Sequence, residues 1–272
     1  MSDKPLVSVI IPDRNRPHLV LEAIRSVFSQ SQSFLLDIEV ILVIDHNPDY
    51  PRQEIRASYP KVKIINNTDK EGPGGSRNTG LAKAKGKYIA FLDSDDQWEQ
   101  NFLSSMVAEL EKNKFVVATT GFSRALIHPN FNFKERIKLY PLMMIRDASL
   151  ISSYLFNRRT LFNGSFFLCQ ISHMLFKARA IKRLRFNYDY RRGGEDWDFF
   201  VQAMEYGSVG VVPRRLLLFR YTPGSSTDSL INRQLKWQSY SLLASRLPKK
   251  FKKGTFYYLF LLYIKLFGGW NV

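Results

Sequence analysis

Two uninterrupted apolar runs near the N-terminus constrain the fold of this 272-residue chain most strongly. Leu6–Ile11 and Asp37–Ile44 are rich in valine and isoleucine, which is typical of strands buried on both faces of a parallel sheet. Between them, apolar residues recur at helical spacing over residues 19–28. A strand, a helix and a second strand in this order predict an open α/β sheet.

The same alternation continues to about residue 112. Val62–Ile65 and Tyr88–Leu92 predict two further strands, and "GPGGSRNTGLAKAKG" predicts a loop that enters a helix ending at Gly86. Another helix is predicted from Asn101 to about Lys112. We therefore expect a Rossmann-like, doubly wound, mostly parallel sheet, in which ligands bind outside the carboxyl ends of the strands.

The second half of the chain carries weaker patterns, and residues 121–165 show no clear period. Later patterns predict a strand at 166–176, helices at 177–184 and 193–207, and strands at Val209–Val212 and Leu216–Tyr221. No internal repeat or low-complexity linker marks off a second independent domain.

The expected organisation is one globular domain followed by a tail. The domain covers residues 1–225, with a nucleotide-binding half over about 1–96 and an acceptor half over about 97–225. The tail covers residues 226–272 and is predicted to be helical, basic and aromatic.

Charged side chains follow three of the predicted strands. "PDRN" follows the first strand, Asp45 the second, and the tetrad "DSDD", with Asp93, Asp95 and Asp96, the fourth. Carboxylates crowded at a strand exit repel one another unless a cation or strong donors lie among them. Hard ions such as Mg²⁺ or Mn²⁺ use one or two protein carboxylates and take their other ligands from water and phosphate. The tetrad predicts a metal diphosphate site, although an aspartate here, Asp96 in particular, could instead cap the next helix.

A second acidic group, Glu195, Asp196 and Asp198, lies at a predicted helix start in "GGEDWDFF". Negative charge is favoured there by about 0.3–1 kcal/mol per group, so capping alone could explain it. The two preceding glycines allow close approach of a ligand, and a general base could equally be presented there. The role of Arg77 in "GGSRNTG" has two similar alternatives: the side chain could pair with a structural carboxylate, or it could contact a phosphate or nucleobase of a ligand.

Composition restricts the possible ligands, cysteine-based sites and location of the protein, but it does not identify an activity. The net charge of +16 predicts a surface that attracts polyanions such as nucleic acid, anionic lipid or nucleotide phosphates. The single cysteine, Cys169, excludes an internal disulfide and a cysteine-built zinc site. The apolar run before Pro12 is too short for a signal peptide or a membrane span, so we expect a cytoplasmic location.

In order and separation, four segments resemble the family 2, GT-A-fold, inverting glycosyltransferases over about residues 5–222. They are "VSVIIPDRNRPHLVLEAIRSVFSQ", "EVILVIDHNPD", "GPGGSRNTGLAKAKGKYIAFLDSDDQW" and "GGEDWDFF". The resemblance implies transfer of a hexosyl or N-acetylhexosaminyl group from a nucleotide-diphosphate sugar, usually a UDP sugar, to a hydroxyl of a glycan or lipid-linked acceptor. It also implies inversion at the anomeric carbon and use of Mn²⁺ or Mg²⁺.

The resemblance assigns donor-binding roles to residues at matching positions. Pro12 and Asp13 stand where the family's first loop lies against the nucleoside, although the family often has threonine at the second position. Asp45 matches the aspartate that binds the nucleobase, and Arg77 matches an arginine near the donor.

Metal and catalytic roles follow in the same way. Asp93 and Asp95 match the ends of the DxD motif, with Asp95 as the direct metal ligand and Asp93 toward the ribose or the metal's water shell. Asp196 matches the catalytic base. Supporting roles are expected for Asp96, Glu195 and Arg220, the last of these in a segment that lacks the family's frequent histidine.

The predicted tail combines a basic cluster with an apolar run. Five basic residues between Arg246 and Lys253 precede Phe256–Phe267, which is shorter than the roughly 20 residues that span a bilayer. This pattern predicts a helix lying in an anionic membrane interface, hence a peripheral position on the cytoplasmic face. The alternative is a helix packed on the domain or on a second subunit, which would make an oligomer.

Two other function classes are weaker. A nucleotidyltransferase that makes nucleotide sugars would use the same kind of sheet, but the first strand is not followed by a glycine-rich, lysine-bearing loop. A non-enzymatic nucleic-acid or membrane-binding protein would explain the charge, but no RNA- or DNA-binding motif is present, so no nucleic-acid partner is expected.

Overall fold

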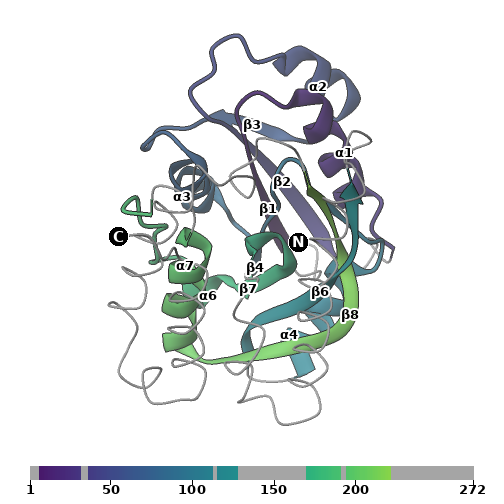
Figure 1. Ribbon diagram of the computed structural model, residues 1–272, viewed down its shortest axis with the longest axis vertical. Helices are drawn as coiled ribbons and strands as arrows, with labels where there is room; N and C mark the ends of the chain where they lie inside the picture. The colour runs from purple at the N-terminus through teal and green to yellow at the C-terminus, as the bar shows by residue number, and fades with distance from the viewer. Residues whose placement is uncertain (1–5, 32–35, 113–114, 128–169, 191–193, 222–272) are drawn as a thin grey trace, which may run out of the picture.

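The computed structural model describes residues 6–31, 36–112, 115–127, 170–190 and 194–221 (Figure 1). The strands are β1 (Leu6–Asp13), β2 (Asp37–Ile44), β3 (Lys63–Asn66), β4 (Tyr88–Phe91), β5 (Gln97–Trp98), β6 (Phe115–Ile127), β7 (Met174–Lys177) and β8 (Ser208–Tyr221). The α-helices are α1 (Pro17–Phe28), α2 (Arg52–Ser58), α3 (Pro73–Lys83), α4 (Phe102–Lys112), α6 (Ala178–Ile181) and α7 (Glu195–Ala203). Two 3₁₀ turns, η4 (Ile171–His173) and η5 (Met204–Tyr206), complete the described elements.

The strands form one mixed sheet in the order β3-β2-β1-β4-β7-β6-β8-β5. β1 pairs in parallel with β2 and β4, and β2 pairs in parallel with β3, so the predicted parallel half is confirmed. β7 runs antiparallel to β4 and β6, and β8 runs parallel to β6. The strand order reverses between β1 and β4, which is where open α/β sheets bind ligands.

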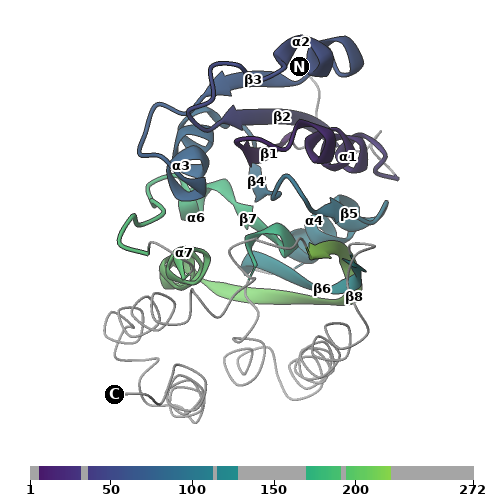
Figure 2. The same cartoon turned by 45° about the horizontal axis from the view of Figure 1, so that its top comes forward.

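Two apolar cores cover the two faces of the sheet, because alternate residues of each strand point to opposite sides. On β1, Val9 and Ile11 pack with residues of α1 and α4, whereas Ile10 packs with residues of α3, α6 and α7. Figure 2 shows these helices on either side of the strands. All four residues of β4 are buried, so this strand lies at the centre of both cores.

Several elements differ from their prediction. The strands predicted at Val209–Val212 and Leu216–Tyr221 are one continuous strand, β8, in which the pairing with β6 shifts register around Pro213. A proline cannot donate to the ladder, and the shift accommodates it. The strand predicted at 166–176 is confirmed only for Met174–Lys177, after the turn η4. Neither α2, β5 nor β6 was predicted.

The tail at 226–272 and most of the segment 121–165 lie outside the described residues. In the part of the chain that the structure describes, every helix is too short or too polar to cross a membrane. The boundaries of the domain and its halves stay predictions.

The packing of α3 on the sheet gives a first test. A Cβ added at Gly80 would collide with Cγ2 of Ile10 and lie 3.2 Å from Cγ2 of Val43, so we expect Gly80→Ala to lower the free energy of unfolding by about 1–3 kcal/mol. Gly74→Ala on the same helix is the matched control, because its Cβ would meet Phe186 at an ordinary 3.4 Å. Urea denaturation measures both, and equal stability of the two variants would contradict the expected close packing.

Candidate active site

The polar residues predicted for the site meet at one edge of the sheet. Pro12 and Asp13 end β1, Asp45 directly follows β2, and residues 93–96 follow β4. The backbone N–H of Asp45 donates to the carbonyl of Asp13 over 2.7 Å, which joins the first two loops. The predicted juxtaposition at the carboxyl ends of the strands is therefore confirmed.

A buried arginine joins the two acidic groups that the sequence shows far apart. Arg77 lies on α3 and is 3% exposed. Its Nη2 donates to Oδ1 of Asp93 over 2.7 Å, and its Nη1 lies 3.0 Å from Oδ1 of Asp196 and 3.6 Å from Oε1 of Glu195. Burial lowers the pKa of the guanidinium, but Asp196, Asp93 and Glu195 outweigh it and raise the pKa above its usual range. One cation thus holds the loop after β4 against the first turn of α7.

Asp196 occupies a position suited to a general base. The chain enters α7 through Gly194, whose φ of +110° is a left-handed conformation that favours glycine. Oδ2 of Asp196 accepts a hydrogen bond from the backbone N–H of Ile171 over 3.3 Å. Burial, with Glu195 and Asp93 nearby, raises the pKa of Asp196 from 3.8 to about 7 against the opposing effect of Arg77. A base with this pKa is poised to accept a proton near neutral pH.

Asp198 has a structural role instead. Its Oδ1 accepts from the hydroxyl of Tyr190 over 3.1 Å, and its Oδ2 accepts from Nε2 of Gln202 over 2.6 Å. Of the three acidic residues in this turn, Glu195 and Asp196 approach Arg77, whereas Asp198 ties α7 to its surroundings.

Asp95 and Asp96 have different environments within the same loop. Asp95 forms an ion pair with Arg16, which precedes α1. Asp96 is buried, with Oδ1 accepting from the backbone N–H of Arg220 over 3.1 Å and Oδ2 without a hydrogen-bond partner. Burial raises the pKa of both carboxyls, and Asp93 raises each further. Asp96 therefore fastens the loop to β8, and α4, which begins at Phe102, is not capped by it.

These residues suit a hard divalent cation. Among the described residues, no three His, Cys, Asp or Glu side chains converge as a complete metal site. Asp93 and Asp95 offer only oxygen donors, and an ion such as Mn²⁺ or Mg²⁺ needs one or two carboxylates when water and phosphate supply the rest. The guanidinium of Arg16 on Asp95 shows that this carboxylate is balanced by a positive charge.

Asp13 anchors its own loop. Its Oδ2 accepts from the hydroxyl of Tyr50 over 2.7 Å and from the backbone N–H of Arg16 over 3.0 Å, and its Oδ1 has no hydrogen-bond partner. Burial and the neighbouring Asp13 carboxylate raise the pKa of Tyr50 above its usual range, so the phenol stays a donor. These contacts explain a carboxylate at this position without a nucleoside.

Asp45 is also engaged by the protein. Its Oδ1 accepts from Nδ2 of Asn67 over 2.8 Å, and its Oδ2 accepts from the backbone N–H of Gly72 over 3.0 Å. Each carboxylate oxygen has a second lone pair, so a further donor can still be accepted. The nucleoside contacts expected for Pro12, Asp13 and Asp45 stay predictions.

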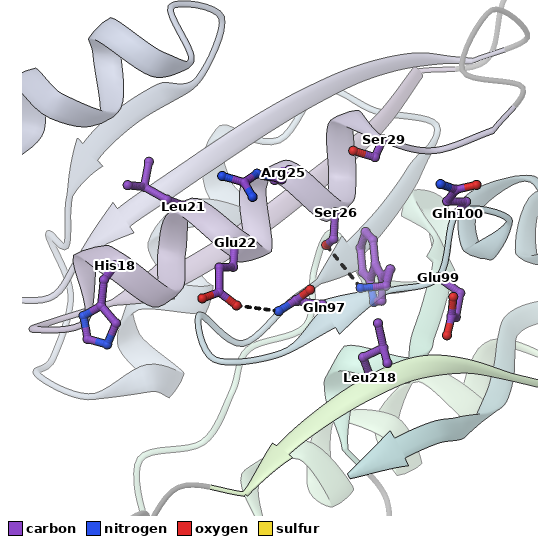
Figure 3. Close-up of a pocket in the computed structure, with 11 residues that line it drawn as sticks. His18, Leu21, Glu22, Arg25, Ser26, Ser29, Gln97, Glu99, Gln100 and Leu218 are labelled. Atoms are coloured by element: carbon purple, nitrogen blue, oxygen red, sulfur yellow. Dashed lines mark hydrogen bonds between the residues drawn. The ribbon is translucent and has the colours of Figure 1, made fainter. Parts of the chain in front are cut away.

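Arg220 connects this edge to a groove beside α1. Its Nε donates to the carbonyl of Asp95 over 3.2 Å, and its Nη2 pairs with Glu22 of α1. Glu22 also accepts from Nε2 of Gln97 over 2.7 Å, inside a groove of about 540 Å³ between α1, β5 and Leu218 of β8 (Figure 3). Arg220 thus supports the backbone of the acidic loop, residues 93–96, through the carbonyl of Asp95.

Sequence reasoning missed several residues that organise the site. Arg16 pairs with Asp95, Tyr50 donates to Asp13, and the hydroxyl of buried Ser172 accepts from the backbone N–H of Asp93 over 3.0 Å. The sequence did carry a signal for Arg16, because this residue follows "PDRN" and directly precedes Pro17, and proline is favoured in the first turn of a helix. Tyr50 and Ser172 carried none, since each meets its partner only through the fold.

Comparison with known proteins adds a family and a fold. The sequence profile of "Glycosyl transferase family 2" matches residues 8–184. The UDP-Glc:alpha-D-GlcNAc-diphosphoundecaprenol beta-1,3-glucosyltransferase WfgD of Escherichia coli is 36% identical over 112 residues, covering 41% of this chain and 43% of its own. The GalNAc(5)-diNAcBac-PP-undecaprenol beta-1,3-glucosyltransferase of Campylobacter jejuni is 28% identical over 190 residues, covering 68% and 56%.

Two solved structures share the fold. S. aureus TarS in complex with UDP has a TM-score of 0.66 and 18% identity, covering 94% of this chain and 71% of its own. The mannosyltransferase PcManGT of Pyrobaculum calidifontis, in complex with GDP-Man and Mn²⁺, has a TM-score of 0.66 and 16% identity, covering 98% and 72%. The predicted GT-A fold is confirmed. The chain spans less than two thirds of several relatives, including 34% of a glycosyltransferase from Rickettsia conorii and 63% of EpsJ from Bacillus subtilis.

The raised pKa of Asp196 predicts a pH-dependent stability. The folded chain holds this proton up to about pH 7, whereas the unfolded chain releases it near pH 4, so ionising Asp196 lowers the free energy of unfolding between these values. Asp196→Asn removes that loss. The stability of the variant minus that of the wild type should therefore rise between pH 4.5 and pH 8, by at least about 1 kcal/mol.

Urea denaturation of metal-free protein at several pH values measures this difference. Glu54→Gln, an exposed change on α2, controls for the loss of one carboxylate. A difference between Asp196→Asn and wild type that stays constant with pH would show that Asp196 does not titrate in this range.

Proposed function

The chain belongs to glycosyl transferase family 2, and we propose that it is an inverting glycosyltransferase. It moves a sugar from a nucleotide-diphosphate sugar to a hydroxyl of a lipid-linked or polysaccharide acceptor. The observation that carries the proposal is the contact of one buried cation, Arg77, with both Asp93 of the acidic loop and Asp196 of α7. The guanidinium of Arg77 thereby holds Asp93, a carboxylate on the donor side, close to Asp196, the candidate general base.

The comparisons support a nucleotide-diphosphate donor, and we propose a UDP sugar. TarS, which shares the fold, binds UDP, and WfgD, which shares sequence, is named for a UDP-Glc donor. PcManGT binds GDP-Man with Mn²⁺, which supports a divalent metal at the acidic loop, residues 93–96. Its nucleobase is guanine and not uracil, so binding experiments with both nucleotides decide the donor of this chain. WfgD and the Campylobacter jejuni glucosyltransferase are named for diphosphoundecaprenol-linked and PP-undecaprenol-linked glycans, and this supports a lipid-linked acceptor.

The proposed chemistry assigns the proton to Asp196. The acceptor oxygen attacks the anomeric carbon, the bond from that carbon to the diphosphate breaks, and the departing diphosphate keeps the electron pair. Asp196 takes the proton that the acceptor hydroxyl loses, as its pKa of about 7 allows. No covalent intermediate with the protein forms, so one displacement inverts the anomeric centre.

The other residues have roles in binding and orientation. Asp95, with Asp93, would hold the metal, and a bound metal would offset the charge that develops on the diphosphate. Arg77 fixes the position of Asp196 and keeps its negative charge compatible with burial. The tail would bring the enzyme to the cytoplasmic membrane surface, where a lipid-linked acceptor lies, but residues 226–272 are outside the described chain and this part rests on sequence.

Donor binding tests the metal site. Calorimetric titration with UDP should show binding that strengthens at least tenfold when Mn²⁺ is present, and Asp95→Ala should abolish the strengthening because the direct ligand is lost. Glu54→Ala, an exposed acidic residue of α2, is the control and should behave as wild type. Binding of UDP that is indifferent to both Mn²⁺ and Asp95 would overturn the metal assignment.

Sugar transfer tests the base. Incubation with radiolabelled UDP sugars and undecaprenyl-diphosphate-linked glycans should give labelled lipid with the wild-type protein. Asp196→Asn should keep UDP binding within a fewfold and lower the transfer rate by about 10²–10⁴-fold, the usual contribution of a general base. Transfer by the variant at the wild-type rate would exclude Asp196 as the base.

A further inference from the structure

Arg16 spans the sheet edge between β1 and β4, although neither composition nor motif singled it out. Its backbone N–H donates to Oδ2 of Asp13 over 3.0 Å, and its Nε lies 3.7 Å from Oδ1 of the same residue. Its Nη1 pairs with Oδ2 of Asp95 across the point where the strand order reverses. Arg16 therefore touches two carboxylates from neighbouring loops with different parts of its chain.

The two contacts differ in how easily they can be broken. The carboxylate of Asp13 is fully buried and also accepts from Tyr50, so the backbone end of Arg16 is fixed. The side chain of Arg16 is 41% exposed and that of Asp95 is 14% exposed, so the guanidinium can leave Asp95 without opening the core. A partly exposed ion pair of this kind contributes little to stability.

The guanidinium also stands where a metal would have to bind. Asp95 is the proposed direct ligand, and its Oδ2 is already paired with Arg16. A cation that approaches this oxygen is repelled by the guanidinium of Arg16 and has to displace it from Oδ2. A nucleotide diphosphate arriving with the metal brings several anionic oxygens, which are preferred partners of arginine.

We propose that Arg16 is a positioning residue that occupies Asp95 in the metal-free chain and transfers its side chain to the donor diphosphate when the metal binds. The idea rests on the proposed function, because it takes Asp95 as the metal ligand. Metal alone must displace Arg16 without giving it a new partner, whereas metal with a diphosphate supplies one. Metal and nucleotide should therefore bind cooperatively, and the coupling should depend on Arg16.

The test measures Mn²⁺ binding to the full chain with and without UDP, by the electron paramagnetic resonance signal of free Mn²⁺. Arg16→Gln keeps the backbone N–H that binds Asp13 and removes the guanidinium, and with it the charge that competes for Asp95 and the 3.7 Å contact of Nε with Asp13. It should lower the dissociation constant of Mn²⁺ alone about fivefold, the equivalent of about 1 kcal/mol, and weaken the coupling between Mn²⁺ and UDP by a similar factor.

Two further variants separate this role from a general effect of charge. Arg14→Gln removes the same charge two residues away, from an arginine that pairs with Glu71 and not with Asp95, and it should leave the affinity for Mn²⁺ unchanged. Arg16→Lys keeps a cation within reach of Asp95 and should restore most of the competition. Thermal melting of each variant checks that the fold is intact.

The possible results distinguish failure of the proposed role of Arg16 from failure of the metal assignment. If wild-type protein binds Mn²⁺ with UDP but Arg16→Gln binds Mn²⁺ alone no better than wild type, the role of Arg16 is overturned and the metal site stands. An equal gain in Arg14→Gln would also overturn it, since net charge would then explain the effect. If no variant binds Mn²⁺ even with UDP, the metal assignment itself fails, and the proposed role of Arg16 fails with it.

Discussion

The site depends on the interaction of the buried Arg77 guanidinium with the carboxylates around it. Three carboxylates, Asp93, Glu195 and Asp196, lie around one positive charge that is almost sealed from water. A buried charge without partners costs several kcal/mol, so the stability of this edge of the sheet depends on these groups meeting. Burial, together with the neighbouring carboxylates Glu195 and Asp93, outweighs the effect of Arg77 and keeps the pKa of Asp196 high enough for it to accept a proton. The same group of charges thus contributes to the packing of the fold and to the proposed proton transfer.

Much of the fold could be predicted because its first half is locally consistent. Continuous valine and isoleucine runs form β1 and β2, and the helical stripe between them forms α1. The second half could not be predicted in the same way. β8 contains Pro213, which divides one strand into two apparent ones, and the pairing of β6 with β8 is decided by partners far away in sequence. Long-range pairing overrides local preference at such places.

The candidate site could be predicted in its residue types but not in its connections. Strand ends placed Asp13, Asp45 and Asp95 at one edge, because parallel strands finish together. The link from Arg77 to Asp196 depends on where the fold places the first turn of α7 relative to α3, and no spacing in the sequence encodes it. The contact of Asp13 with the hydroxyl of Tyr50 is a further connection that no spacing in the sequence encodes.

The central position of β4 has a consequence for motion. This strand is buried at all four residues and is paired on both sides, in parallel with β1 and antiparallel with β7. Its amides can exchange with solvent only when both halves of the sheet separate, which costs close to the whole free energy of unfolding. The acidic loop begins at the end of this strand. The carboxylates thus directly follow a strand that opens only with the whole sheet, whereas the side chain of Arg16, which faces Asp95 from the segment between β1 and α1, is 41% exposed.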